Sequence, residues 1–328
     1  MNMYECDELR LYRGKAVHIN RNFCITIPSL DQIEEFGEKR YFNAVHNLTS
    51  VGADLKWQLW DLGVDYTQIE DYDLFVKLIF QSISSKKNLY DAIIVNPEKF
   101  EKKFDNDELD ELLVNPMQLI MKETVTSKKL FKEISNNYEE FGLWMDCYGT
   151  EYSEDFVLNL EENLKDDSPT IFYRDVDFSH YQPCIKQENK QVILYNSKAD
   201  IAFDRLTYSQ VTEIVRKIHG FKRNNQIPAN ERTKMDLIDD ARDEAMLAAT
   251  KPFKSVLKSL ISALQVYSGQ CGNEQIWNMP ISTFFENIKR IGKVQDAQLL
   301  LQGAYSGFAN LKGVDKNRLD MFGDIGTS

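Results

Sequence analysis

The four histidines are the first residues to consider for chemistry, because imidazole serves both as a metal ligand and as a general acid or base. They are spread along the chain as His18, His46, His180 and His219. None lies in a Cys-x-x-Cys or His-Glu-x-x-His pattern, so the sequence contains no zinc-site spacing. We expect ordinary core or surface histidines and no bound metal. If zinc were present, His180 and Cys184 would be the first ligands to test.

Motifs for phosphate binding and nucleophilic catalysis are missing from the sequence as well. There is no Gly-x-Gly-x-x-Gly, no Gly-x4-Gly-Lys-Ser/Thr and no Gly-x-Ser-x-Gly, and the fifteen glycines are scattered. The sequence therefore predicts no catalytic residue, no cofactor-binding residue and no cofactor. An enzyme whose site is assembled only in three dimensions is one alternative to this non-enzymatic reading.

A group of carboxylates between residues 236 and 244 could in principle bind a divalent cation, since such ions prefer oxygen ligands. Its members are Asp236, Asp239, Asp240, Asp243 and Glu244. Spacings of three and four place several of them on one helical face, but Lys234 and Arg242 interleave. We favour a solvated helix face. The acidic run from Glu151 to Asp167 is interpreted in the same way, with partner docking as the alternative.

One local basic patch could contact phosphate. It consists of Arg216, Lys217, His219, Lys222 and Arg223. Basic residues at a helix C-terminus are also favoured by the helix dipole, which explains some of them without a ligand. The net charge of the chain is −12, which argues against a nucleic-acid partner because most of the surface would repel phosphate. A nucleic-acid-associated regulator that uses this patch is a second alternative.

Two tryptophans, Trp57 and Trp60, lie in an apolar segment that ends at Gly63. One explanation is core packing of an amphipathic helix. The other is an interface anchor, because tryptophan is enriched at binding hot spots. Both explanations stay open at this point, and we take Trp57 and Trp60 as the interface candidates.

The elements that position these residues are two hairpins and a series of helices. Short β-rich runs flank turn residues at 16–27 and again at 191–203, which predicts a hairpin at each place. Helical spacing with a capping box predicts helices that begin at Thr67 with Glu70 and at Thr207 with Gln210. Gly220 supplies the stop for the second of these helices. The segment 97–132 predicts short helices that start near Asp107 and Ser127.

The C-terminal half is predicted to be helical. A charged helix spans 230–249, and Thr250-Lys251-Pro252 predicts the start of the next helix. Pro280 opens another, which we expect to end at Gly292 before a last short helix at 295–304. We expect a shared core among these helices, made of Leu257, Leu260, Leu264, Trp277, Phe284 and Ile288.

The chain has 328 residues, of which 43% are hydrophobic and 27% charged, a composition typical of a soluble globular protein with about two domains. We predict a mainly α fold with small β-hairpin elements, an α+β class with a helical C-terminal half. The expected parts are an N-terminal mixed lobe at 1–167, a hairpin and helical lobe at 168–312, and a loosely held tail at 313–328.

The cysteines and the termini indicate a reduced, non-exported protein. The five cysteines, Cys6, Cys24, Cys147, Cys184 and Cys271, are widely separated and odd in number, which predicts free thiols in a cytoplasm. The first ten residues lack the basic and apolar regions of a secretory signal. No apolar run approaches the roughly 20 residues that span a bilayer, so we expect no membrane partner.

The stretch Ile276 to Ile281, followed by Phe284-Phe285 and by Ile288 to Ile291, resembles a signature of proteins from tailed phages of Gram-positive hosts. Two flanking pieces agree with it, Lys251 to Ser255 and Gln298 to Gly307. The residues that carry the resemblance, Trp277, Pro280, Phe284, Phe285 and Ile288, also suit a helix start followed by a core-facing side. We therefore assign them a structural role.

The resemblance implies a tail-morphogenesis protein without a catalytic site, either a tail or baseplate component of the virion or a tail-assembly chaperone. Its partners would be other phage tail proteins, and a homo-oligomer is compatible with this reading. The protein would then be found in the host cytoplasm during assembly, and in the virion tail if it persists in the particle.

Overall fold

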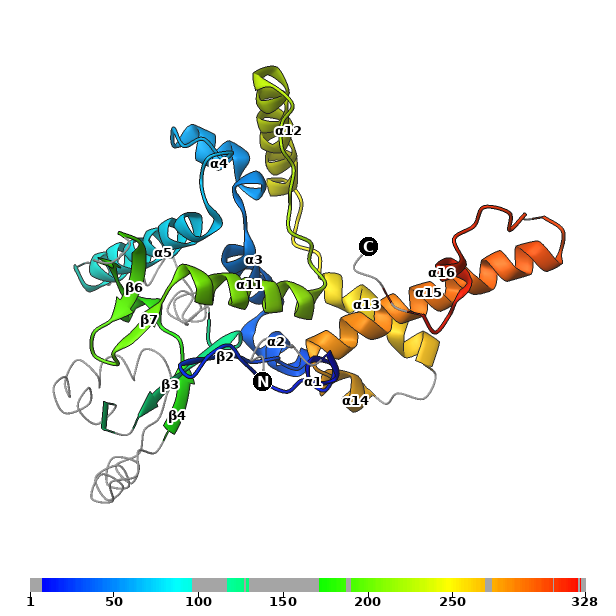
Figure 1. Ribbon diagram of the computed structural model, residues 1–328, viewed down its shortest axis with the longest axis horizontal. Helices are drawn as coiled ribbons and strands as arrows, with labels where there is room; N and C mark the ends of the chain where they lie inside the picture. Colours follow the sequence, from blue (N-terminus) through cyan, green and yellow to red (C-terminus); the bar gives the residue numbers. More distant parts are fainter. Residues whose placement is uncertain are drawn as a thin grey trace.

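A computed structural model of the chain describes residues 8–95, 117–126, 128–129, 171–186, 190–268, 273–308, 310–323 and 325. Over these residues the fold is α+β, as the sequence predicted, with helices around two small antiparallel sheets (Figure 1). The expected helix start near Asp107 and the acidic run 151–167 lie outside the described residues.

The first sheet has the strand order β1-β2-β3-β4 and contains the first predicted hairpin. Its strands are β1 (Val17–His18), β2 (Phe23–Ile25), β3 (Met121–Thr126) and β4 (Ile171–Asp175). The Asn20 side chain stabilises the hairpin turn, because its Oδ1 accepts hydrogen bonds from the backbone N–H groups of Asn22 and Phe23 at 2.8 and 2.9 Å. The hairpin is thus confirmed, but it forms only half of a larger sheet.

Strand β3 replaces the helical structure expected at 121–126 within the segment 97–132, whereas Lys128 and Lys129, next to the helix start expected near Ser127, are helical. Its residues alternate between buried and half-buried positions, and each pairs with a residue of β4 or β2. Thr124, Val125 and Thr126 favour this extended form, since β-branched side chains fit a pleated sheet better than a helix. The charged residues that suggested a helix, Lys122 and Glu123, find partners on β4 instead.

The second sheet has the order β5-β6-β7 and contains the second predicted hairpin. Its strands are β5 (Gln182–Ile185), β6 (Val192–Asn196) and β7 (Ile201–Phe203). Asn196 holds the β6–β7 turn by accepting from the N–H groups of Lys198 and Ala199. Strand β5 was not predicted, because most of its side chains are exposed and its sequence shows no alternation.

The N-terminal helices are α1 (Glu8–Tyr12), α2 (Leu30–Phe36), α3 (Glu38–Thr49), α4 (Lys56–Asp61) and α5 (Asp71–Val95), with short 3₁₀ turns at Gly52–Asp54 and Phe178–His180. The predicted start of α5 at Thr67 is wrong by one turn. The Asp65 carboxylate accepts from the Thr67 N–H at 2.9 Å and holds a separate turn there. The first helical bond of α5 then runs from the Leu74 N–H to the Glu70 carbonyl.

The C-terminal helices are α11 (Arg205–His219), α12 (Glu231–Ala249), α13 (Val256–Ser268), α14 (Asn273–Trp277), α15 (Ile281–Tyr305) and α16 (Lys316–Leu319). The cap of α11 is Asp204 and not Thr207: Asp204 Oδ1 accepts from the Thr207 N–H at 2.9 Å. Gly220 ends α11 as predicted, in the left-handed conformation with φ 65°. Helix α12 matches its predicted span, and Asn230 caps its N-terminus.

Two predicted boundaries in this half are corrected. Helix α13 begins after Ser255, whose Oγ accepts from the Lys258 N–H at 2.9 Å, so Pro252 belongs to the preceding connection. Helix α15 does not stop at Gly292 but continues to Tyr305. A single glycine lowers helix stability by only about 1 kcal/mol, which the flanking helical turns offset.

The residues after Gly313 were expected to be loosely held, yet they return to α15. Arg318 forms an ion pair with Asp296, with a 2.8 Å N–O distance, and Lys293 donates to Asn317 at 3.1 Å. Arg290 donates to the Met321 and Gly323 carbonyls. These contacts dock α16 against the middle of α15. The contacting residues are more than twenty positions apart in the sequence, so the local sequence pattern of the tail does not predict these contacts.

One main hydrophobic core joins most of the described elements. Its centre is an aromatic group in which the rings of Phe23, Phe75 and Phe178 surround Phe203, with centroid distances of 5.3 to 5.7 Å. The cluster draws buried residues from both sides of position 167, and the first sheet likewise takes β4 from beyond that position. The sheet and the core thus bridge the boundary predicted between the two lobes.

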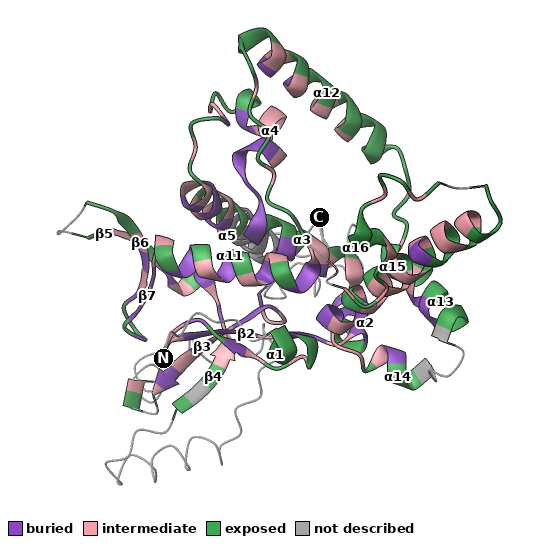
Figure 2. Ribbon diagram, turned by 45° about the vertical axis from the view of Figure 1, so that its right-hand side comes forward, coloured by how far each residue is buried: buried purple, intermediate pink, exposed green. Residues whose placement is uncertain are grey.

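Two helices project from this body. Helix α12 stands away from it on two extended connections, and the distal part of α15 extends to another side (Figure 1). Figure 2 shows that α12 is exposed over most of its surface. A smaller, second cluster, made of Leu59, Tyr66, Leu74 and Ile238, packs against the first half of α12.

Candidate functional site

The residues that carry the phage-like signature occupy a packing junction. The Ile281 N–H donates to the Pro28 carbonyl at 2.9 Å, and the Leu30 N–H donates to the Met279 carbonyl at 3.1 Å. This bridge ties the start of α15 to the start of α2. Pro280 also contacts Gly14, where a Cβ would lie 2.4 Å from the proline Cγ.

The predicted core of the C-terminal half forms at this junction. Phe284 is fully buried, while Trp277, Phe285 and Ile288 are half-buried against the same cluster. Leu257, Leu260 and Leu264 of α13 belong to it as well. The structure therefore places the signature residues in the interior, in agreement with their assigned structural role.

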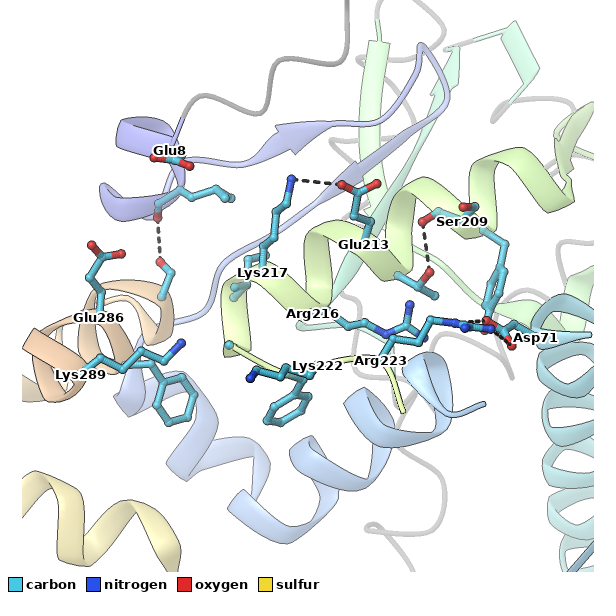
Figure 3. Close-up of a pocket in the computed structure, with 18 of the residues that line it drawn as sticks. Glu8, Asp71, Ser209, Glu213, Arg216, Lys217, Lys222, Arg223, Glu286 and Lys289 are labelled. Carbon is cyan, nitrogen blue, oxygen red and sulfur yellow. Dashed lines mark hydrogen bonds and ion pairs between the residues drawn. The ribbon is translucent and has the colours of Figure 1, made fainter. Parts of the chain in front are cut away.

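An open groove of about 1650 Å³ lies beside α11. It is lined by α1, residues 67–72, α11 with the loop after it, and α15 (Figure 3). This groove contains the basic patch predicted from the sequence. Carboxylates line it too, among them Glu8, Asp71, Glu213 and Glu286.

Most of the basic patch is engaged within the protein. The Arg223 guanidinium makes a two-bond contact with the Asp71 carboxylate, at 3.0 and 3.1 Å. Lys217 pairs with Glu213 one turn earlier on α11, at 3.1 Å. The pKa of Arg223 is raised above its ordinary value by the Asp71 hydrogen bond. Arg223 and Lys217 are therefore already neutralised by carboxylates of the protein.

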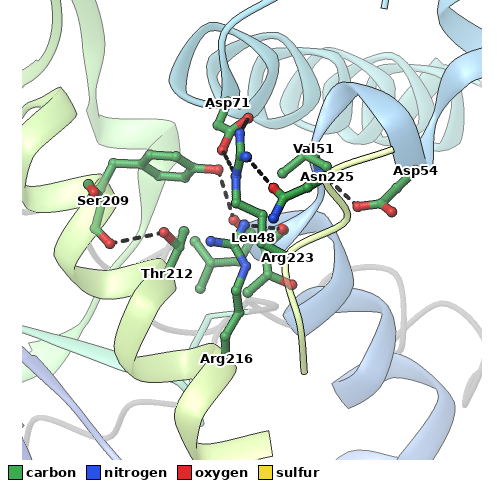
Figure 4. A network of polar contacts seen from close by, with 11 residues as sticks. Leu48, Val51, Asp54, Asp71, Ser209, Thr212, Arg216, Arg223 and Asn225 are labelled. Atoms are coloured by element: carbon green, nitrogen blue, oxygen red, sulfur yellow. Dashed lines mark hydrogen bonds and ion pairs between the residues drawn. The ribbon is translucent and has the colours of Figure 1, made fainter. Parts of the chain in front are cut away.

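Arg216 has a different structural role, at the end of α3. It donates to the Thr49 carbonyl at 2.6 Å, while the Tyr208 hydroxyl donates to the Leu48 carbonyl at 3.2 Å (Figure 4). The last carbonyls of a helix have no partner within the helix and carry partial negative charge, so a guanidinium there is stabilising. Arg216 thus caps α3 from a neighbouring helix.

Two lysines of the groove, Lys222 and Lys289, have no hydrogen bond or ion pair within the part of the chain that the structure describes. Lys289 lies over Gly220, where a Cβ would come within 2.2 Å of its Nζ. Glu8 and Glu286 line the same groove. The seven basic side chains of the lining are opposed by five carboxylates, so the groove lacks the strongly positive potential that would attract a phosphate chain.

His219, the histidine of the patch, is buried where α3, α11 and α15 meet. Its Nδ1 lies 2.7 Å from the Val215 carbonyl and must donate to it, so Nε2 accepts from the Tyr41 hydroxyl, also at 2.7 Å. The rings of Phe42, Phe221 and Phe285 lie within 6.5 Å. Burial lowers the pKa of His219 to about 4, so the ring is neutral near pH 7.

A buried carboxylate that sequence reasoning missed lies on β3. Glu123 is 1% exposed; Arg174 of β4 donates to it at 2.7 Å, and Tyr181 donates to its other oxygen. Burial and the Glu123 charge raise the pKa of Tyr181. Each polar atom of Glu123 thus has a partner, which a buried charge requires. The sequence signal that could have indicated this burial is the alternation along β3, which places Glu123 on the same side as Met121 and Val125.

The two tryptophans lie on α4, where α12 packs against it. Trp57 is half-buried in the second cluster, which favours the packing interpretation for this residue. Trp60 is 37% exposed, and Lys234 Nζ lies 5.7 Å from its ring. Lys234 also pairs with Asp65 at 2.7 Å. Trp60 is thus the more accessible of the two interface candidates.

The acidic group on α12 is solvated, as predicted. Asp236, Asp239, Asp240, Asp243 and Glu244 are all exposed. Arg242 bridges Asp239 at 2.9 Å to Asp61 of α4 at 2.7 Å. Beyond this contact, the end of α12 presents Met246 and Leu247, which are 56% and 63% exposed.

No group of three or more potential metal ligands gathers among the described residues. His180 lies 3.7 Å from Asp177, and Cys184 lies on β5. Cys24 and Cys184 are free, and burial raises the pKa of the Cys24 thiol. Cys6, Cys147 and Cys271 fall outside the described part of the chain.

The chain matches no protein-family model, no curated protein and no solved structure. Within the described residues, none of the helices combines the length and the apolar character that crossing a membrane requires. Function must therefore be argued from the surfaces of the molecule itself.

Proposed function

We propose that this chain is a non-enzymatic phage tail-morphogenesis protein that binds other tail proteins. The observation that carries the proposal is the projecting helix α12, which presents an apolar end next to an acidic face. A tail or baseplate component and a tail-assembly chaperone are both compatible with such a surface. The sequence resemblance at residues 276–291 supports the phage context.

The C-terminal half of α12 is more exposed than its first half. Helix α12 buries only Lys234 and Ile238 of its own residues, and both lie in its first half. Leu247 follows Asp240, Asp243 and Glu244 at helical spacings of seven, four and three, so it shares their face. An apolar centre with a charged rim is the usual anatomy of a protein–protein interface.

The two parts of this surface would act differently on a partner. Exposed carboxylates such as Asp240 would set the association rate and its salt dependence, since solvated charges contribute little to affinity. Leu247 and Met246, once buried in a partner, would set the residence time. The proposal therefore expects affinity to depend on the apolar residues.

The nucleic-acid alternative receives less support, because Arg216, Lys217 and Arg223 are engaged with protein groups. A binding titration with DNA at several salt concentrations tests it, since phosphate contacts give a steep slope. An enzyme remains the other alternative, and the mixed-charge groove beside α11 is its candidate substrate site.

The test of the proposal is co-purification of tail proteins from phage-infected cells. Leu247→Ser should weaken the capture by about 30-fold or more, the effect expected for a hot spot of about 2 kcal/mol. The matched control is Leu206→Ser, because Leu206 is also a helical leucine that is 63% exposed. Asp240→Asn should change the affinity by less than about 1 kcal/mol.

Equal capture by all three variants would refute the role of α12, and loss with Asp240→Asn alone would reveal a specific polar site. Trp60→Ala and Trp57→Ala extend the series to the α4 candidates. Mass spectrometry of purified virions then separates the two versions of the proposal: a stoichiometric amount of this chain indicates a virion component, and its presence only in the lysate indicates a chaperone.

A further inference from the structure

The distal part of α15 differs in charge from the rest of the chain. From Ala297 to Leu311 the sequence contains no Asp, Glu, Lys, Arg or His, although 27% of all residues are charged. Residues 297–308, which we call the α15 tip, form the end of the projecting helix and the turn after it (Figure 1). A long exposed segment without charge needs an explanation, because solvated helices normally carry charged faces.

The α15 tip is apolar as well as uncharged. Leu299 is 69% exposed, Tyr305 88% and Phe308 92%. No described residue after Ile291 belongs to either hydrophobic cluster. Single exposed apolar side chains are ordinary, but several on one uncharged surface mark an interaction site.

The end of the tip has a defined backbone. The Phe308 N–H donates to the Gly303 carbonyl at 2.9 Å, and Gly307 adopts φ 75°. This is the glycine-based helix termination in which the residue after the glycine usually packs back on the last turn. Here the residue it would meet is Gly303, which has no side chain, so the Phe308 ring stays exposed.

Within the described residues the chain covers only one side of the tip. Ala297 is buried and Leu300, Leu301 and Ala304 are half-buried, whereas Leu299, Tyr305 and Phe308 stay exposed. Helix α16 returns to α15, but it docks nearer the base, through Arg318 to Asp296 and Lys293 to Asn317. The last two charged residues of α15, Lys293 and Asp296, are thus both engaged with α16. The apolar surface begins directly beyond these ion pairs.

We propose that the α15 tip is the self-association surface of this protein, where a second copy of the chain packs its own tip across a two-fold axis. In such a contact every residue faces the same patch of the other copy. A chain of net charge −12 repels its own copies over most of its surface. The tip of one copy can pack against the tip of a second copy without bringing like charges together. Because the tip is uncharged, it has no group that would select a charged partner. This inference does not depend on the proposed function.

The test is the mass of the purified full chain, measured by sedimentation over a range of concentrations. Wild type should form a dimer, and Phe308→Glu should weaken the dimer by at least about 100-fold, because two carboxylates would then face each other without counterions. Phe308→Lys alone should have the same effect. An equimolar mixture of the two variants should dimerise again, since opposite charges would then meet.

The matched control is Phe322→Glu, because Phe322 is 91% exposed and lies outside the tip; this variant should remain a dimer. A monomeric wild type at every concentration would overturn the inference, and so would a Phe308→Glu chain that dimerises normally. Failure of the mixture to associate would exclude a two-fold contact at this residue. Leu247→Ser should leave the dimer intact, so this experiment and the tail-protein capture can fail independently.

Discussion

His219 shows how a single residue can be taken for part of a ligand site when it belongs to the core. Its neighbours in sequence are basic, which made it a member of a phosphate-contacting patch. In the structure its imidazole points inward, bonded to Tyr41 of α3 and to the Val215 carbonyl of its own helix. The environment favours the neutral ring, and this has a consequence for stability at low pH.

We predict that the free energy of unfolding falls as the pH decreases from about 6.5 to 4. The pKa of His219 is 6.5 when unperturbed and about 4 in the folded chain, so between these values only the unfolded state binds the proton. Above pH 6.5 the stabilisation is complete; it is lost as the pH falls toward the folded pKa. The expected loss is about 3 kcal/mol, measurable by urea unfolding at pH 7 and pH 4.

The controls for this prediction are two histidine variants. His219→Gln should reduce the difference in unfolding free energy between the two pH values by most of that amount. His46→Gln removes an exposed imidazole and should keep the wild-type pH dependence. If the two variants respond to pH alike, burial of His219 is not the cause.

At the scale of elements, the start of α15 is the best-supported junction. Its backbone pairs with the segment before α2, and its first turn inserts Phe284 into the main core. Pro280 fits there because it needs no N–H partner and precedes the first helical residue. The signature residues thus join the segment before α2 to the start of α15.

We predict that Phe284→Ala lowers the free energy of unfolding by about 3 to 5 kcal/mol, through lost apolar burial and a residual cavity. Phe322→Ala is the control, because the same side chain is removed at a site that is 91% exposed. Its effect should stay within about 0.5 kcal/mol. Chemical denaturation of both variants measures this, and similar losses would show that the core is not centred on Phe284.

At the scale of the whole molecule, the described residues form one body with projecting helices. The main core binds the sheets, α3, α11 and α15 together, whereas α12 is held only by the small second cluster and by ion pairs from Lys234 and Arg242. Local stability follows the amount of buried apolar contact. The projecting helix should therefore open more easily than the body.

Hydrogen exchange tests this difference. Backbone amides in the C-terminal half of α12, residues 240–249, should exchange much faster than those of α11, which packs against α3, α5 and α15. Both helices are charged and similar in length, so composition alone would predict similar protection. Equal protection would mean that α12 is covered in solution, and addition of a tail-protein partner should slow exchange in α12 specifically.

The sequence was sufficient where the decisive interactions are local. The hairpins at 16–27 and 191–203, the stop at Gly220 and the span of α12 depend on turn residues, caps and periodicity within a few positions. The solvated acidic face of α12 could be predicted for the same reason, since helical spacing alone places Asp240 and Glu244 outward. The α+β class followed from these elements together.

Tertiary structure decided the rest, because the partners are far apart in sequence. Strand β3 forms by pairing with β2, about a hundred residues earlier in the chain, and with β4, about fifty residues later. This pairing overrides the helical pattern around Met121. Arg216 changes from a possible phosphate ligand to the cap of α3 only once Thr49 lies beside it. Burial of Glu123 and exposure of Leu247 and Phe308 depend equally on which surfaces the fold covers. The sequence determines which side chains are present, but the contribution of each side chain to stability or binding depends on its neighbours in the folded structure.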